Sequence, residues 1–517
     1  MRYFLFAAAL CADTYPRQPG VDAVHYVFRL TLADDTDEIT GEATVDLRFE
    51  NGVTEFTLDL ASSMTVTGVA SGGSDVLFEH KSNRLTIPAG GHRQFTVHYR
   101  GKPARGLRIG PNGYKERTFF SLNWPNLARE YLPIIDHPYD KATSEFLITA
   151  PSKYQVVANG LLQEERDLGD GRRLTHWKQS VPIASWLNAI GVAQFSVRHF
   201  GFAKGIPLQT WVYHQDREKG IATFETPTRQ AIEFFSDRIG QYPYEKLANV
   251  QAAELRGGTE HASEIFYGEP SLTMRPATGL VAHEIAHQWW GNSVTEKDWD
   301  DVWLSEGFAT YFTLLFTEHH SGRDAFVAGL KRNRDTVRTF EKKNPELAVI
   351  HSNLADMRRV LNPLVYQKGG WVLHMLRGRV GTDTFWTGIR EYYKRYRDGN
   401  ASTDDFRRVM EEVSGEDLGW FFRQWLNRAG SPVVEGSWRY NTAGRKIEIE
   451  LSQTQPGGAY RLPLEIGVKG ADAAMRIEKI EMTRQQQRFD LAAGAEPAAV
   501  TLDPETWMLF EGQLSRR

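Results

Sequence analysis

Two histidines, His283 and His287, bracket Glu284 in an apolar stretch of the chain. On an α-helix, side chains four residues apart lie about 40° apart around the axis, so both imidazoles can reach one ion. Glu284 lies about 100° from His283 on the same helix and can approach a water molecule on that ion. This spacing predicts a helix that carries part of a metal site.

A catalytic zinc site has three protein ligands and one open position, so the two imidazoles need a further ligand. After a polar loop, the next helical run, 304–319, carries Glu306 near its start. We expect His283, His287 and Glu306 to hold one zinc ion per chain, with water as fourth ligand. Glu284 is then the general base. A His-Glu-His pattern also arises by chance on helix surfaces, but Glu306 at this spacing argues against chance.

The composition narrows the possible sites and partners. The 517 residues suggest about three domains, and Cys11 is the single cysteine, which excludes a multi-thiolate zinc site and an internal disulfide. Apolar residues make up 41%, charged residues 24%, and the net charge is −4. These values are typical of a globular protein and give no indication of a nucleic-acid partner.

Strand and helix patterns alternate in blocks along the chain. Apolar and polar residues alternate over 43–49 and again over 447–451, the period of a strand with one solvated face. The pattern changes near Thr223, where a helical segment extends to about Ile239, and helical patterns dominate from Leu280 to about Arg428. The segment 430–432 marks the return to strands. The glycines of 106–113 are interpreted as a loop and not as a phosphate cradle. The sequence thus predicts a multidomain α+β protein.

The N-terminus resembles a short secretory signal. Arg2 precedes an apolar run, Tyr3 to Ala12, with cleavage expected near Ala12. This predicts export to the periplasm or the medium. The alternative is a disordered apolar tail or a misplaced start, which would leave the protein cytoplasmic. No other stretch approaches the length of a transmembrane helix.

The segment from His283 to Phe312 reads HEIAHQWWGNSVTEKDWDDVWLSEGFATYF and resembles the core of the gluzincin aminopeptidases, the family of aminopeptidase N and leukotriene hydrolase. Segments 133–143 and 156–160 match as well, so the resemblance covers nearly the whole chain. Larger members add a helical domain over the active site; nothing remains after Arg517 to build one, so a comparatively open cleft is expected. The resemblance implies a possible signal or tail (1–14), an N-terminal β-domain (15–205), a thermolysin-like catalytic domain (206–430) and a small C-terminal β-sandwich (431–517).

The segment Gly257-Gly258-Thr259-Glu260-His261 is similar to the family's Gly-Ala-Met-Glu-Asn exopeptidase motif. The resemblance implies that Glu260 pairs with the free α-ammonium of the substrate and that Gly257, Gly258 and His261 also contact substrate. A carboxylate fixed at one depth admits a charged N-terminus only one residue from the zinc. Out of this context the segment would be a glycine turn followed by a solvated glutamate.

Tyr366 begins the segment YQKGG, where the family has a tyrosine that donates its hydroxyl to the oxyanion. Four positions depart from the family pattern. Thr259 and His261 replace Met and Asn, and Ser305 replaces a common Asn. Trp124 stands where relatives have Gln or Glu as a second amine anchor, which leaves one carboxylate for that task.

These residues together predict a zinc aminopeptidase that acts on peptides with a free N-terminus. The alternatives are a limited endopeptidase or an epoxide hydrolase on the same zinc site, or a non-catalytic peptide-binding relative. His374, on an apolar helix, is expected to be a core histidine and not a metal ligand. The sequence sets no oligomeric state.

Overall fold

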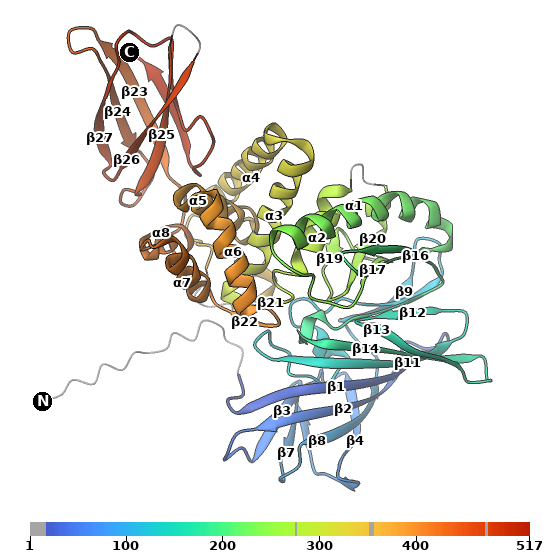
Figure 1. Cartoon of the computed structure of the whole chain (residues 1–517). Helices are drawn as coiled ribbons and strands as arrows, with labels where there is room; N and C mark the ends of the chain where they lie inside the picture. Colours follow the sequence, from blue (N-terminus) through green and yellow to red (C-terminus); the bar gives the residue numbers. More distant parts are fainter. Residues whose placement is uncertain (1–16, 274–276, 351–355, 471–473) are drawn as a thin grey trace, which may run out of the picture. The chain divides into compact units, whose positions relative to one another are not determined.

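The computed structural model describes residues 17–273, 277–350, 356–470 and 474–517, so the signal predicted at 1–14 lies outside the described residues. The chain divides into two compact units, and Figure 1 labels their helices and strands. The first comprises Met1–Ser305, Asn353–Met357 and Arg390–Thr403, and the second comprises Glu306–Ser352, Arg358–Ile389 and Asp404–Arg517. Among the described residues, no helix combines the length and the apolar character that crossing a bilayer requires.

The first unit is rich in β-structure. Its strands are β1 (Val21–Thr31), β2 (Ile39–Phe49), β3 (Glu55–Asp59), β4 (Met64–Ser71), β5 (Ser74–Asp75), β6 (Glu79–Lys81), β7 (Arg84–Pro88), β8 (Gln94–Gly101), β9 (Leu107–Pro111), β10 (Arg117–Ser121), β11 (Lys141–Pro151), β12 (Gln155–Ala158), β13 (Leu161–Asp167), β14 (Arg172–Ala184), β15 (Ile190–Ala193), β16 (Phe195–Ala203), β17 (Ile206–Tyr213), β18 (Leu247–Ala252), β19 (Gly258–Thr259), β20 (Glu264–Gly268), β21 (Val294–Glu296) and β22 (Gly399–Ala401).

These strands form several sheets. The largest has the order β13-β14-β11-β1-β2-β8-β4-β5, and smaller sheets have the orders β3-β7-β6, β12-β15-β10-β9 and β21-β22. Along β2, buried residues alternate with partly exposed ones, including Ala43, Val45 and Leu47 on the buried face. The strand predicted over 43–49 is therefore confirmed, because one face of this sheet packs into the core.

The loop predicted for 106–113 is wrong in its centre. Residues Leu107–Pro111 form β9, which pairs antiparallel with β10. Glycine has a low preference for strands, but whether a segment forms a strand also depends on the strand beside it. Here β10 supplies that partner, and Leu107 is buried against it.

The first unit also contains a five-stranded sheet of order β16-β17-β18-β20-β19. β17, β18 and β20 run parallel, and the short strand β19 pairs antiparallel with β20 at the edge. Helix α1 (Arg217–Arg238) packs against β17 and against α2 (Thr278–His287). Short 3₁₀ turns complete the unit: η1 (Ala128–Glu130), η2 (Ser185–Leu187), η3 (His214–Asp216), η4 (Glu269–Leu272) and η5 (Trp299–Asp301).

The second unit contains helices and two further sheets. Its helical elements are α3 (Trp303–Ser321), which begins in the first unit, α4 (Arg323–Lys343), η6 (Met357–Arg359), η7 (Leu364–Lys368), α5 (Gly369–Val380), α6 (Thr382–Tyr396, which ends in the first unit), α7 (Thr403–Ser414) and α8 (Gly419–Leu426). The strands are β23 (Val433–Asn441), β24 (Lys446–Gln453), β25 (Leu462–Lys469), β26 (Met475–Met482), β27 (Gln486–Ala492), β28 (Ala499–Leu502) and β29 (Glu511–Arg516).

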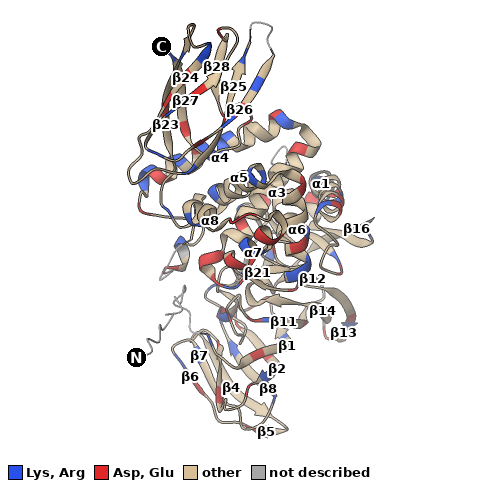
Figure 2. Ribbon diagram, turned by 60° about the vertical axis from the view of Figure 1, so that its left-hand side comes forward, with Lys and Arg blue, Asp and Glu red and all other residues tan. Residues whose placement is uncertain are grey.

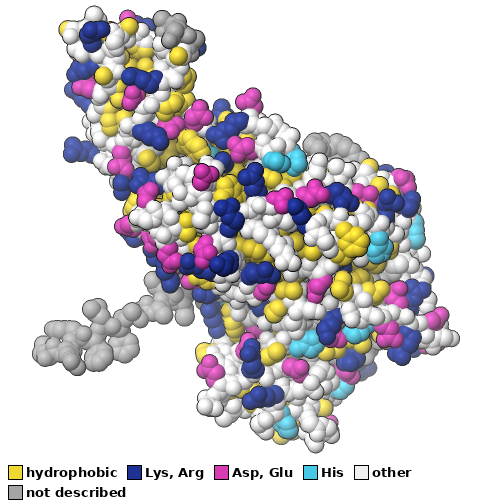
Figure 3. All heavy atoms as spheres, viewed as in Figure 1, with side chains coloured by type: hydrophobic (Ala, Val, Ile, Leu, Met, Phe, Trp, Pro, Cys, Tyr) yellow, Lys and Arg dark blue, Asp and Glu magenta, His cyan; other side chains and the backbone are white. Residues whose placement is uncertain are grey.

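The C-terminal strands form a sheet of order β27-β24-β23-β29 and a sheet of order β26-β25-β28. Residues of β24 alternate between buried and partly exposed, so the strand predicted over 447–451 is confirmed. Basic and acidic residues are mixed along the helices and strands (Figure 2), and their side chains are mixed on the face drawn in Figure 3. The protein is thus a mixed α+β chain with a β-rich N-terminal part and a helical part that follows it.

Candidate metal centre

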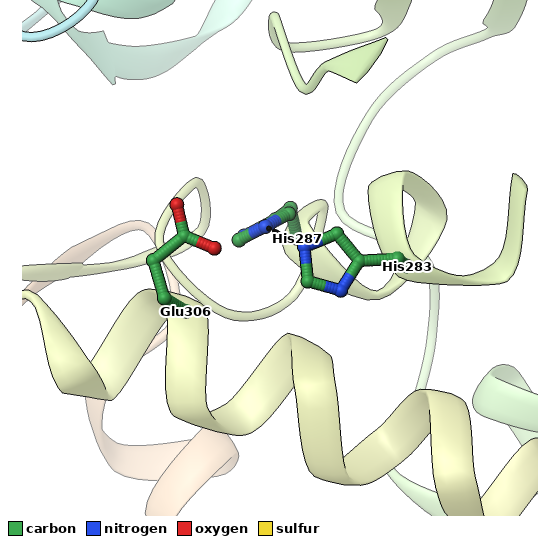
Figure 4. A group of neighbouring side chains, drawn as sticks. All are labelled: His283, His287 and Glu306. Carbon is green, nitrogen blue, oxygen red and sulfur yellow. Dashed lines mark hydrogen bonds between the residues drawn. The ribbon is translucent and has the colours of Figure 1, made fainter. Parts of the chain in front are cut away.

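Helix α2 brings His283 and His287 side by side (Figure 4). Their Nε2 atoms are 3.2 Å apart, and the two rings are nearly perpendicular at 88°. Two ligands on a tetrahedral zinc with bonds of about 2.0–2.1 Å lie roughly 3.3 Å apart. The separation therefore fits two nitrogens that share one ion.

The opposite nitrogen of His287 is held by the chain that follows the helix. Its Nδ1 lies 3.1 Å from the carbonyl oxygen of Trp290 and 3.1 Å from Oγ of Ser305. A carbonyl can only accept, so Nδ1 carries the proton and Nε2 offers its lone pair. Gly291 makes this arrangement possible: its φ is +95°, and a Cβ there would overlap the Ser305 hydroxyl.

Glu306 follows Ser305 on α3. The ligand atoms of His283, His287 and Glu306 all lie within 4.8 Å of one another. Figure 4 shows the carboxylate directed toward the two imidazoles. The three residues predicted as ligands are brought together and could hold a metal ion with one position left open.

Two more carboxylates approach the same histidine. Glu260, Glu284 and His287 also have ligand atoms within 4.8 Å of one another, and all three are buried. The carboxylate of Glu284 lies against Gly258, where a built Cβ would come 2.5 Å from Oε1. Gly257 has a φ of +82°, which favours glycine at the turn into β19. The two glycines thus shape the backbone beside the carboxylates.

Gln288 and Asn292 fix the position of Glu260 through its backbone. The Glu260 carbonyl accepts hydrogen bonds from Gln288 Nε2 at 3.1 Å and from Asn292 Nδ2 at 2.6 Å. Gln288 Oε1 also accepts from the backbone N–H of Ser263 at 2.9 Å. Both side chains are fully buried. Sequence reasoning missed them, although a glutamine directly after His287 on a buried apolar helix is a usable signal.

Lys141 anchors the loop after α2. Its Nζ donates to the carbonyl oxygens of Asn292 at 3.0 Å, Ser293 at 2.8 Å and Gly399 at 3.1 Å. Burial lowers the pKa of Lys141 to about 7. In the sequence this lysine is only one residue of the segment 133–143, and its contacts with the loop are seen in the structure alone.

His261, predicted to contact substrate, is fully buried. Its ring packs at 4.8 Å from that of Phe266, and burial lowers its pKa to about 3. Thr259 lies on β19 opposite Phe266 and is 6% exposed. The imidazole is therefore neutral at physiological pH, and its contact with substrate stays a prediction.

Trp124 joins an aromatic cluster in the first unit. Its ring lies 5.1 Å from that of Trp299 and 6.2 Å from that of Trp186. Trp186 and Trp299 are fully buried, whereas Trp124 is partly exposed. Relatives were expected to carry a second amine anchor at this position. Here the indole ring of Trp124 occupies it and packs against other aromatic rings.

Tyr366 lies in the π-helical turn η7. The N–H of Gly369 donates to the carbonyl oxygen of Leu364, five residues back, which is the bond that defines such a turn. Gly307, the neighbour of Glu306 on α3, lies against this turn, because a Cβ on it would come 3.1 Å from the Val365 carbonyl oxygen. π turns are rare and recur at functional sites.

Comparison with known families agrees with this geometry. The model of the peptidase M1 N-terminal domain matches residues 22–187, and that of the peptidase family M1 domain matches residues 224–425. The chain belongs to peptidase family M1. Members of this family are zinc metallopeptidases, and the second match contains both histidines and Glu306.

Relatives of this M1 chain include glutamyl aminopeptidase of Mus musculus, which is 28% identical over 367 residues, covering 67% of this chain and 38% of the relative. Probable aminopeptidase 1 of Saccharolobus solfataricus is 25% identical over 448 residues, covering 81% of this chain and 55% of the relative. The chain therefore spans less than two thirds of the length of these relatives.

A solved structure has a similar fold. The crystal structure of Legionella pneumophila aminopeptidase A in complex with aspartic acid matches with a TM-score of 0.82 at 18% identity. The match covers 96% of this chain and 60% of that chain. At this identity the likeness establishes the M1 fold.

Proposed function

We propose that this M1 chain is a zinc aminopeptidase that hydrolyses the first peptide bond of peptides with a free N-terminus. The proposal rests mainly on the convergence of two histidines and three carboxylates: His283, His287 and Glu306 as one group, and Glu260, Glu284 and His287 as another. The first group has the donor set of a catalytic zinc site, namely two imidazoles and one carboxylate. The second group places two further carboxylates, those of Glu260 and Glu284, next to the proposed zinc site.

The residues present fit zinc. The 3.2 Å between the two Nε2 atoms suits tetrahedral ligands, and the Trp290 carbonyl selects the tautomer of His287 that can bind metal. When bound, zinc supplies Lewis acidity: it lowers the pKa of water and polarises the scissile carbonyl. We assign His283, His287 and Glu306 as its ligands.

Glu284 is assigned as the general base. Its carboxylate lies against Gly258, is 5% exposed, and approaches His287. From this position it can take a proton from the attacking water and deliver it to the leaving nitrogen. The carboxylate is held by burial and by the backbone of β19, so little reorganisation is needed during the transfer.

Glu260 is assigned as the anchor of the substrate's α-ammonium. The carboxylates of Glu260 and Glu284 lie within 4.8 Å of each other, so an ammonium that donates charge-assisted hydrogen bonds to Glu260 is held next to the base. An ammonium held at Glu260 places the first peptide bond, and not a later one, at Glu284. Because Trp124 is apolar, Glu260 acts as the single acidic anchor from this motif.

Tyr366 is assigned to donate its hydroxyl to the oxyanion that develops during attack. Such donors contribute most when they are positioned before the reaction, and an irregular helical turn at the tyrosine supports this role. The domain limits 15–205, 206–430 and 431–517, with a thermolysin-like middle domain and a C-terminal β-sandwich, belong to the same proposal.

Peptides with a free N-terminus are the proposed partners, and export through a signal in residues 1–14 is the proposed localisation. A limited endopeptidase is the second candidate, because Trp124 leaves the ammonium with fewer charges to pair with. The names of the relatives, glutamyl aminopeptidase and aminopeptidase A, support the exopeptidase and suggest acidic residues for the first position tested.

The proposal is tested with a panel of aminoacyl fluorogenic substrates, including glutamyl and aspartyl ones, each with an N-acetylated counterpart. We expect cleavage of the free-amine members alone and loss of activity with a zinc chelator. Glu260→Ala should lower kcat/KM for free amines by about 10–100-fold, the value of a charge-assisted pair. Glu218→Ala, at an exposed glutamate, is the matched control. Equal cleavage of free and acetylated substrates would refute the amine anchor.

A further inference from the structure

Lys368 ends the π turn that carries Tyr366, and its side chain is completely buried. Its Nζ donates to Oε1 of Glu341 at 2.8 Å and to the carbonyl oxygen of Gly430 at 2.6 Å. Burial lowers the pKa of Lys368, and the Glu341 carboxylate opposes that shift. The turn is thus attached by one side chain to α4 and to the segment between α8 and β23.

The acceptors of Lys368 are themselves held in place. Ser431 Oγ donates to the same Oε1 of Glu341 at 3.0 Å. The Gly430 carbonyl accepts a second hydrogen bond, from the Tyr460 hydroxyl at 3.0 Å. The ammonium therefore meets a rigid set of oxygens, and its position is determined by residues from three separate segments.

The acceptors of Lys368 border a pocket. A cavity of about 370 Å³ is lined by Glu341, Gly430, Ser431 and Tyr460 together with residues of α4 and of the C-terminal strands. A buried ion pair contributes little net stability, because desolvation offsets the attraction between the charges. Its effect is to favour one position of the buried lysine over others.

We propose that Lys368 is a positioning residue for Tyr366: its attachment to Glu341 and Gly430 sets the conformation of the π turn and thereby the direction of the Tyr366 hydroxyl. The inference rests on the proposed peptidase function and on the role assigned to Tyr366. It also links the oxyanion donor to the start of the C-terminal β-region, since Gly430 and Ser431 precede β23. Displacement of that segment would change turnover without removing a catalytic group.

The test is a double-mutant cycle with Lys368→Met and Tyr366→Phe, in the full-length zinc enzyme with an aminoacyl fluorogenic substrate. Methionine keeps the unbranched chain up to the ε position and removes the ammonium group. Glu341→Gln is the second variant, because glutamine retains an oxygen acceptor and preserves folding if Lys368→Met does not fold. Arg377→Met is the matched control, since Arg377 lies on α5, the helix that follows the turn, and pairs with Glu318 of α3.

We expect Lys368→Met to lower kcat at least tenfold with KM and zinc content unchanged, and Glu341→Gln to lower it by a smaller factor. In the Tyr366→Phe background neither change should lower kcat further. Equal losses in both backgrounds, or an unchanged kcat, would overturn the positioning role while leaving the peptidase proposal intact. If Tyr366→Phe alone were fully active, the assignment of Tyr366 would fail, and the role of Lys368 with it.

Discussion

Gly307 and Gly369 lie in direct backbone contact: a Cβ on Gly307 would come 2.9 Å from Cα of Gly369 and 3.1 Å from the Val365 carbonyl oxygen. Gly307 follows Glu306 on α3, and Gly369 follows the turn that carries Tyr366. The two glycines thus allow the helix with the proposed zinc ligand and the turn with the proposed oxyanion donor to approach as closely as their backbones permit.

Gly307→Ala should therefore force α3 and the turn apart, since backbone atoms cannot move aside as a flexible side chain can. We expect a loss of about 1–3 kcal/mol in the free energy of unfolding, the usual cost of overpacking, together with a lower kcat. Thermal unfolding and steady-state kinetics measure both effects. Gly279→Ala on α2 is the control, because a Cβ there meets no atom within 4 Å. Equal stability of the two variants would contradict the close contact.

Glu284→Gln separates proton transfer from metal binding. Glutamine has the shape to occupy the space against Gly258 but cannot take a proton. We expect kcat to fall by about 10²–10⁴-fold, the usual contribution of a general base, with zinc content unchanged. Elemental analysis and initial rates provide the two readouts. A Gln variant with substantial turnover would remove Glu284 from the role of base.

Tyr366→Phe removes one hydroxyl from the π turn. If that hydroxyl donates to the oxyanion, kcat should fall by about 10²–10³-fold while KM and zinc content stay near the wild-type values. Tyr114→Phe is the control, because Tyr114 donates to Asp216 at the surface. Comparable rates for Tyr366→Phe and the control would mean that another group stabilises the oxyanion.

His374 provides a prediction for acid stability. The Tyr311 hydroxyl lies 3.2 Å from Nδ1 and the Thr506 carbonyl oxygen 2.9 Å from Nε2, so the core histidine expected from the sequence is confirmed. Burial lowers its pKa to about 3, below an ordinary value of about 6.5. Between these values the unfolded chain binds a proton that the folded chain does not. Its stabilising contribution is thus complete above pH 6.5 and falls by about 1.4 kcal/mol per pH unit on acidification.

His374→Gln should reduce that dependence, because glutamine can donate to Thr506 and accept from Tyr311 without titrating. The measurement is the melting temperature at pH 7, 6 and 5. Chelator-treated protein is used so that loss of metal in acid does not affect the result. We expect the melting temperature of the variant to fall less steeply between pH 7 and pH 5 than that of the wild type. If the melting temperatures of variant and wild type fell equally with pH, the pKa of His374 would not be lowered by burial as we expect.

The sequence pattern correctly predicted strands that have one buried face and one solvated face. The alternation over 43–49 and 447–451 corresponds to β2 and β24, because each strand has a single buried face. The four-residue spacing of His283 and His287 was sufficient to bring both rings to one side of a helix. These are relations between residues close in sequence.

Relations that depend on distant segments could not be read from the sequence. The three carbonyls that Lys141 binds come from two segments far along the chain. The ion pair of Lys368 with Glu341 likewise joins residues from separate helices. No local spacing indicates such contacts.

The metal content of wild-type protein and of Glu306→Ala tests the account most directly. Elemental analysis of the purified, dialysed chain should find one zinc per wild-type molecule and little or none in Glu306→Ala, because two imidazoles alone bind the ion weakly. A variant that folds as the wild type does and retains a full equivalent of zinc would contradict the claim that His283, His287 and Glu306 hold one ion together.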